Sequence, residues 1–297
     1  MAKISHIKIS KNKPNLNPPK VREIYKRRRQ AKFKKAIIWV VIVLIFFIGL
    51  SFVSRIKEIN IQTINVKGNN VLTKEEITKV VEGQLNGRYF YLFNKRNGFI
   101  FPSKKIKEAL QNSFERIEAI DVHEDNVKTL TVSVKERAGV YLLCDPHVEG
   151  VDDKPCFYVD AAGLVFSQAP FFSGNVYFRF YDGRSGATHE VGKKFMDTAE
   201  FVRLTDFIYY LGKLGIKVDG INLKDKDEDE FILASPNDET APPKILFMKD
   251  SDYKKIAGDM TAAIATEPLK SLYKNSFDKL LYLDLRFENK VYYKFAQ

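Results

Sequence analysis

The sequence contains few of the residues on which catalytic and metal sites are usually built. Its 297 residues include four histidines, which are scattered along the chain, and two cysteines that are 12 positions apart. Neither spacing matches the close pairs of zinc sites, and no nucleophile elbow, phosphate-binding loop or pair of carboxylates is complete. These absences favour a binding protein over an enzyme. They predict no catalytic residue, no metal and no cofactor.

Acidic residues are almost absent from the first 35 positions. This stretch holds 13 Lys or Arg and one acid, Glu23, whereas the rest of the chain holds the other 35 basic and 36 acidic residues. The net charge of +11 therefore lies in the tail and is not that of a nucleic-acid-binding domain. Because such a composition cannot bury enough apolar surface, residues 1–35 are expected to form a disordered basic tail that contacts anionic lipid headgroups.

Charge is absent from the next 19 positions, Ala36 to Ser54. As a helix this run is about 28 Å long, close to the thickness of the hydrocarbon layer, so residues 36–54 are predicted to span a membrane once. A cleaved signal peptide is the alternative, with Gly49 and Ser51 resembling a cleavage site. The excess of basic residues before the run places the N-terminus in the cytoplasm and the later residues outside it.

Residues 61–137 have the pattern of a small α/β module. A short strand near Ile64 and Val66 precedes a helix that begins at a capping box, Thr73 and Glu76, and a second helix is expected after Pro102. Two strands with alternating apolar residues follow, up to about residue 136. The order strand, helix, helix, strand, strand predicts a three-stranded sheet with helices covering one face.

Short strands dominate residues 138–297, interrupted by helices predicted at about residues 195–211 and 251–265. The last 17 residues alternate apolar and polar side chains on both sides of a tight turn at Glu288 to Lys290, as in a β-hairpin. With no later element to pair with it, the strand from Val291 to Phe295 is expected to be a sheet edge, which is either blunted or used.

Four stretches together resemble the FtsQ/DivIB family of bacterial cell-division proteins. The runs "INVKGNNVLTKEEI" and "VSVKERAGV" are similar to its POTRA domain, and "FYVDAAGLVF" and "YLDLRFENKVYYK" resemble its β-domain hairpins. The fold class implied is α+β: a basic tail, one transmembrane helix, a POTRA domain over 61–137 and a mainly antiparallel β-domain over 138–297 with helices on one side. Ala138 stands where the family usually has Pro.

The resemblance implies a non-catalytic scaffold at the division septum, which binds single-pass partners similar to FtsB (DivIC) and FtsL and so links cytoplasmic division factors to septal peptidoglycan synthesis. Two alternatives belong to other classes. A POTRA-containing component of a transport or assembly machine would normally carry repeats of the module and a membrane barrel. A membrane-tethered wall hydrolase would need a catalytic constellation.

The final strand is the predicted partner-binding site, through addition of a partner strand to the sheet. In this prediction the aromatic side chains give contact area, and the basic side chains meet acidic groups of the partner. The residues assigned to this site are Arg286, Phe287, Val291, Tyr292, Tyr293, Lys294 and Phe295. Use of the edge is favoured over simple blunting, for which Lys294 would also be typical.

Cys144 and Cys156 flank a turn-rich segment on strands expected to be neighbours. Outside the cytoplasm such a pair can close a disulfide, with two free buried thiols as the alternative. A zinc site that combines this pair with His147 and His189 is the weaker possibility, because the ligand spacing is wrong.

Overall fold

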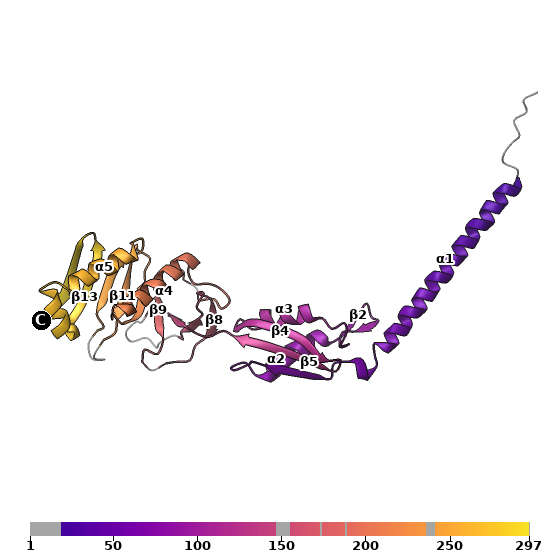
Figure 1. The fold of residues 1–297 in the computed structure, drawn as a ribbon, viewed down its shortest axis with the longest axis horizontal. Helices are drawn as coiled ribbons and strands as arrows, with labels where there is room; N and C mark the ends of the chain where they lie inside the picture. The colour runs from indigo at the N-terminus through magenta and orange to yellow at the C-terminus, as the bar shows by residue number, and fades with distance from the viewer. Residues whose placement is uncertain (1–18, 147–154, 173, 188, 236–240, 297) are drawn as a thin grey trace, which may run out of the picture. The chain divides into compact units, whose positions relative to one another are not determined.

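The computed structural model describes residues 19–146, 155–172, 174–187, 189–235 and 241–296. These residues form a long helix near the N-terminus, a three-stranded sheet, a two-stranded hairpin and a nine-stranded sheet with helices (Figure 1). The chain divides into two compact units. The first comprises Met1–Asn65, Glu82–Ser103 and His123–Thr131, and the second comprises Val66–Val81, Lys104–Val122 and Val132–Gln297.

The helix α1 runs from Pro19 to Val53, with its described side chains exposed almost to the end. The structure extends this helix through residues 19–35, where the sequence analysis expects disorder, and residues 1–18 lie outside the described part of the chain. Lys, Arg, Gln and Ala have high helix propensity and need no buried face to continue a helix whose next turns are strongly apolar. Pro19 at the first helical position also fits, since its missing N–H would have no partner there.

The α/β module has the expected elements in the expected order. They are β1 (Thr63–Lys67), α2 (Lys74–Leu85), α3 (Ser103–Ser113), β4 (Ile117–Asn126) and β5 (Thr129–Glu136), and a short 3-10 helix that was not predicted, η1 (Lys57–Ile59), precedes them. The sheet order is β1-β5-β4. At the start of α2 the capping box is present, because Thr73 N donates to Glu76 Oε2 (2.9 Å) and Glu76 N donates to Thr73 Oγ1 (3.2 Å).

Between α2 and α3 lies a hairpin that the sequence pattern did not predict, β2 (Arg88–Tyr89) with β3 (Phe93–Asn94). Its turn is closed by Leu92 N donating to Tyr89 O (2.9 Å). Strands of two residues are too short to show a hydrophobic period, which explains why the alternation rule missed them.

The nine-stranded sheet has the order β14-β13-β12-β11-β10-β9-β6-β7-β8. Its strands are β6 (Tyr141–Cys144), β7 (Phe157–Val159), β8 (Val165–Gln168), β9 (Phe178–Asp182), β10 (Val218–Leu223), β11 (Glu228–Leu233), β12 (Lys244–Met248), β13 (Leu280–Phe287) and β14 (Lys290–Phe295). Most neighbouring pairs are antiparallel, and the exceptions are β6·β9, β9·β10 and β12·β13. The predicted mainly antiparallel sheet is confirmed.

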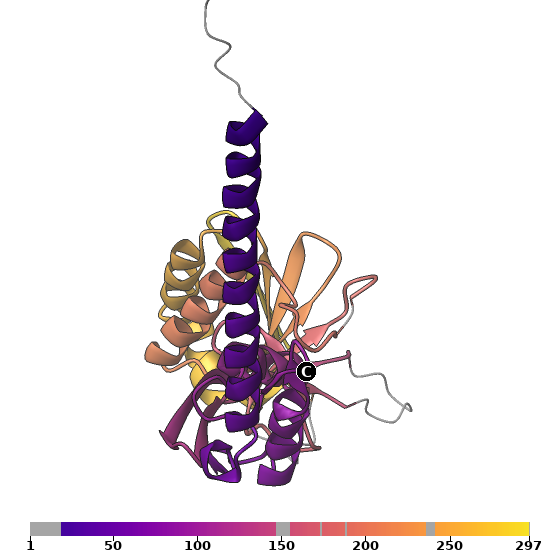
Figure 2. The same cartoon turned by 90° about the vertical axis from the view of Figure 1, so that its right-hand side faces the viewer.

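Each helical connection in this sheet joins a parallel pair, because parallel neighbours need a crossover. The helix α4 (Thr198–Lys213) connects β9 with β10. The helices α5 (Tyr253–Ile264) and α6 (Leu269–Asn275), followed by η2 (Phe277–Lys279), connect β12 with β13. Figure 2 shows the orange and gold helices on the same side of the strands, as the family resemblance implies.

A single apolar cluster lies between those helices and the sheet. Phe201 and Leu204 of α4 and Ile256 of α5 pack with Phe180 and Phe247 of the strands, all of them buried. Burial of a large apolar side chain contributes roughly 1.5–3 kcal/mol, so this shared cluster fixes both crossovers to one face. The order of the strands, and therefore the place of β14 at the end of the sheet, depends on it.

The carboxylate of Asp229 on β11 is buried close to this cluster, with the side chain 1% exposed. It accepts a hydrogen bond from Lys224 N (3.0 Å) and lies 3.8 Å from Lys249 Nζ. Burial raises the pKa of Asp229 to about 6, more than these contacts lower it. The acidic run from Asp225 to Glu230 thus leads from the β10–β11 connection into β11, and Asp229, the second residue of the strand, points inward.

The raised pKa predicts a stability that falls as pH rises from about 4 to about 6, since the folded state then binds a proton that the unfolded state has lost. Asp229→Asn should remove this dependence. At pH 8 it should unfold with a free energy higher than the parent's by on the order of 2 kcal/mol, and at pH 4 the two should agree. Urea denaturation of residues 59–297 at both pH values checks this. A variant that is less stable at pH 8 would contradict it.

Candidate partner-binding edge

The strand β14 ends the nine-stranded sheet and pairs on one side with β13. The two strands are joined by Glu288 and Asn289, and Asn289 has a φ of 57°, a conformation that Asn tolerates better than most residues. On the other side of β14, no strand follows among the residues that the structure describes. One row of backbone donors and acceptors therefore has no sheet partner within the described chain.

The direction of each donor follows from the pairing. Ala296 N donates to Lys279 O (2.8 Å), so the N–H of residue 296 points toward β13. Both register shifts add the extra residue to β13, which leaves the alternation along β14 unbroken. The N–H groups of Tyr292 and Lys294 therefore also point inward, and those of Val291, Tyr293 and Phe295 point outward.

The side chains of β14 differ in burial. Val291 and Phe295 pack against the apolar cluster, whereas Tyr292 is 49% exposed and Tyr293 is 36% exposed. Phe287 on β13, also half exposed, meets the Tyr292 ring edge-on at 5.2 Å. The predicted aromatic residues are thus brought together on and next to the edge strand.

A groove of about 430 Å³ lies beside β14. The α5–β14 groove is lined by Asp259, Ala262, Ala263, Thr266, Glu267, Pro268, Leu269, Asn289, Val291 and Tyr293. The helical side of this site was missed by the sequence analysis, because its small residues resemble an ordinary packing face. Ala262 and Ala263 keep α5 thin where it passes the strand, so space remains next to the edge.

Arg286 has a different environment from the one expected. Its guanidinium donates to both oxygens of Asp284 (Nε to Oδ1 2.9 Å, Nη2 to Oδ2 2.7 Å) and also bonds Glu228 of β11. Hydrogen bonds to Asp284 and Glu228 raise the pKa of Arg286. Burial alone would raise the pKa of Asp284, but the bonds from Arg286 hold it below its usual value. Since its charge is already paired, Arg286 orders the hairpin, and contact with a partner is left to the exposed residues.

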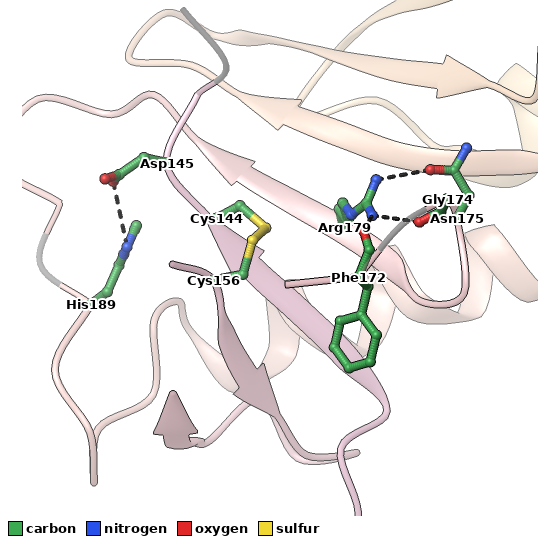
Figure 3. Close-up of a disulfide and its surroundings, with 8 residues drawn as sticks. All are labelled: Cys144, Asp145, Cys156, Phe172, Gly174, Asn175, Arg179 and His189. Carbon is green, nitrogen blue, oxygen red and sulfur yellow. Dashed lines mark hydrogen bonds and ion pairs between the residues drawn. A yellow bond between two sulfur atoms is a disulfide. The ribbon is translucent and has the colours of Figure 1, made fainter. Parts of the chain in front are cut away.

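Cys144 and Cys156 form a disulfide, with Cα atoms 4.4 Å apart (Figure 3). A loop of this length gives a stabilisation of about 3 kcal/mol in the chain-entropy model. Nearby, His189 Nδ1 lies 3.5 Å from Asp145 Oδ1, and the buried Nε2 has no hydrogen-bond partner among the described residues. With both sulfurs bonded to each other, the cysteines offer no thiolate to a metal, and His147 lies outside the described residues.

In a comparison with known protein families, residues 59–137 match the POTRA domain of the FtsQ type. The match begins two residues before the predicted start and ends at the predicted end. No curated protein matches the chain. Within the described residues, one helix, Glu23–Val53, is long and apolar enough to cross a membrane, with a mean hydropathy of 3.1 over its most apolar window.

Removal of the paired guanidinium should destabilise the hairpin. Arg286→Ala leaves Asp284 and Glu228 facing each other unpaired, so we expect a loss of roughly 2–4 kcal/mol at pH 7 by urea denaturation of residues 59–297. Because the pKa of Asp284 is depressed, this contribution is present above the unfolded pKa and is lost as pH falls through the folded one.

The control is the double variant Arg286→Ala/Glu228→Gln, in which one of the two facing charges is removed. It should recover part of the lost stability at pH 7. If Arg286→Ala were as stable as the parent at pH 7, the three side chains would not form the network described.

Proposed function

Because residues 59–137 form a POTRA domain of the FtsQ type, we propose that this chain is a division protein of the FtsQ/DivIB kind that crosses the cell membrane once and binds its partners outside the cytoplasm. The single observation that carries the binding role is the β14 edge, an unpaired strand beside a groove. The role is that of a scaffold at the septum, and the FtsQ-type family is generally non-catalytic.

The membrane topology in this proposal rests on α1. Its apolar segment, 36–54, matches the hydrocarbon thickness, and the exposed basic turns from Lys26 to Lys35 precede it directly. Basic residues on one flank favour the cytoplasm, so the N-terminus lies inside and both sheets lie outside. The helical form of residues 19–35 is about 25 Å long and carries Lys26 about 15 Å beyond the bilayer if the helix continues straight, far enough to reach cytoplasmic division factors as well as headgroups.

Partner binding in this proposal is strand addition. An extended segment of the partner pairs with the outward N–H and C=O groups of Val291, Tyr293 and Phe295, which gives affinity without sequence requirement. The side chains that the segment places on the core-facing side enter the α5–β14 groove, and those on the other side contact Tyr292 and Phe287. The groove thereby supplies the specificity that main-chain bonds lack.

Charge along the edge defines the partner further. Lys290 and Lys294 are exposed on β14, and Asp259 and Glu267 lie in the groove. An alternating segment with acidic residues on one side and small apolar or basic residues on the other fits this arrangement. The partners proposed are single-pass division proteins similar to FtsB (DivIC) and FtsL, which would stand beside this chain in the same membrane.

The experiment is a proline substitution at an outward donor. Tyr293→Pro removes one N–H from the open row and keeps the ladder to β13, so the fold is retained and partner binding is lost. An unmade bond to a buried acceptor costs about 1–3 kcal/mol, so the Kd for the ectodomain of the organism's FtsB-like protein should rise roughly 5- to 150-fold. Titration calorimetry on residues 59–297 measures it.

Two matched controls separate the donor from other effects. Tyr293→Ala removes the ring and keeps the N–H, and Gln168→Pro places the same change at an outward position of β8, the opposite edge of the sheet. Equal affinities for Tyr293→Pro and Tyr293→Ala, with circular dichroism unchanged, would refute strand addition at β14.

A further inference from the structure

Two aromatic residues stand at the tip of the β2–β3 hairpin. Phe90 is 88% exposed and Tyr91 is 90% exposed, and both have positive φ, 47° and 63°. Positive φ at two successive turn positions favours Asn and Gly, and bulky residues adopt it at a cost in free energy. Packing within the protein does not offset this cost, because both rings are almost fully exposed. A contact outside the protein explains the pair better.

This hairpin is attached to the end of α1. Ser51 Oγ donates to Leu92 O (2.6 Å), and Asn94 N donates to Ser54 Oγ (3.0 Å). The ring of Phe93 meets that of Phe47 edge-on at 6.5 Å. All of these residues belong to the first compact unit, so the placement of the hairpin against the helix does not depend on the second.

The attachment fixes the depth of the hairpin relative to the apolar segment. Ser51 lies three residues before the end of that segment and Phe47 lies seven, which on a helix are about 4–5 Å and 10 Å inside it. If residues 36–54 span the bilayer, the hairpin tip is at the outer headgroup level and not in open solvent. Aromatic residues are the ones enriched at that level, where an apolar ring and a polar edge are both satisfied.

The surroundings of the tip agree with this position. Asn60 Nδ2 donates to Ser54 O (3.2 Å) and Asn94 Nδ2 donates to Asn60 Oδ1 (3.0 Å), so a polar network satisfies the backbone where α1 ends. Arg88 on β2 and Arg55 after α1 are exposed and basic, as contact with lipid phosphate requires. Phe99, 73% exposed, is a further exposed aromatic residue of the same unit.

We propose that the tip of the β2–β3 hairpin, Phe90 and Tyr91, inserts into the outer headgroup region of the membrane that α1 spans and so fixes the POTRA domain to the bilayer surface. The proposal rests on the single-span topology of the proposed function. A rigid second contact next to the span restricts the directions in which the rest of the chain can point, because the POTRA domain is held at two places instead of one.

The experiment uses fluorescence of the full chain in lipid nanodiscs. The chain has one tryptophan, Trp39, so the double variant Trp39→Phe/Tyr91→Trp reports on the tip alone. With lipids brominated near the top of the acyl chain, the indole at the tip should lose more than half of its emission, and aqueous acrylamide should quench it weakly. Strong acrylamide quenching with no effect of brominated lipid would overturn the proposal. Trp39→Phe/Phe90→Trp serves as a second reporter with the same expectation if the first folds poorly.

Fluorescence of Trp39 in the parent chain distinguishes a hairpin that does not insert from a helix that does not span the membrane. Trp39 itself lies in the apolar segment and should be quenched by brominated lipid. If Trp39 is quenched in the parent and the indole at the tip is not quenched in the variant, the helix spans and the hairpin does not insert. If Trp39 is not quenched, the span is wrong and the proposed function fails with it. Nanodiscs that contain only lipid also exclude a protein partner as the source of shielding.

Discussion

A strand in a sheet forms backbone hydrogen bonds on two sides, and β14 has a sheet neighbour on only one of them within the described chain. The position of this open row is a consequence of the two helical crossovers, since α4 and α5 pack on one apolar cluster and thereby set the strand order that leaves β14 last. Exposed edges of this kind are normally blunted. In the proposed function this edge, which borders a groove and exposed aromatic rings, receives a strand of the partner.

Side-chain contacts fix the register of the edge strand and the end of α1. The Arg286 network joins β13 to β11 and keeps the final hairpin in register, which matters because a slip of one residue would exchange the inward and outward donors. At the other end of the chain, the polar contacts of Ser51, Ser54 and Asn60 tie the end of α1 to the β2–β3 hairpin. In the proposed function, the two features act together: one restrains the chain at the membrane and the other presents a strand to partners in the same membrane.

Much of this could be predicted from the sequence because it depends on local patterns. The charge-free run predicted the apolar part of α1, the capping box predicted the start of α2, and the alternation from Leu281 to Phe295 predicted the last hairpin. The resemblance to the FtsQ type is confirmed for the POTRA domain. What the sequence could not give depends on contacts between distant residues: Glu228 beside Arg286, the groove formed by α5, and Ser51 beside Leu92. The helical start at Pro19 was missed because composition indicates whether a segment can be buried and not whether it can be helical.

Residue-resolved amide exchange of residues 59–297, measured by NMR with and without the partner ectodomain, tests the central claim most directly. In the absence of the partner, the outward amides of Val291, Tyr293 and Phe295 should exchange fast, and those of Tyr292 and Lys294 should be protected by β13. Partner binding should slow the three outward amides and leave the two inward ones unchanged. Partner binding that leaves the outward amides as fast as before would contradict the account.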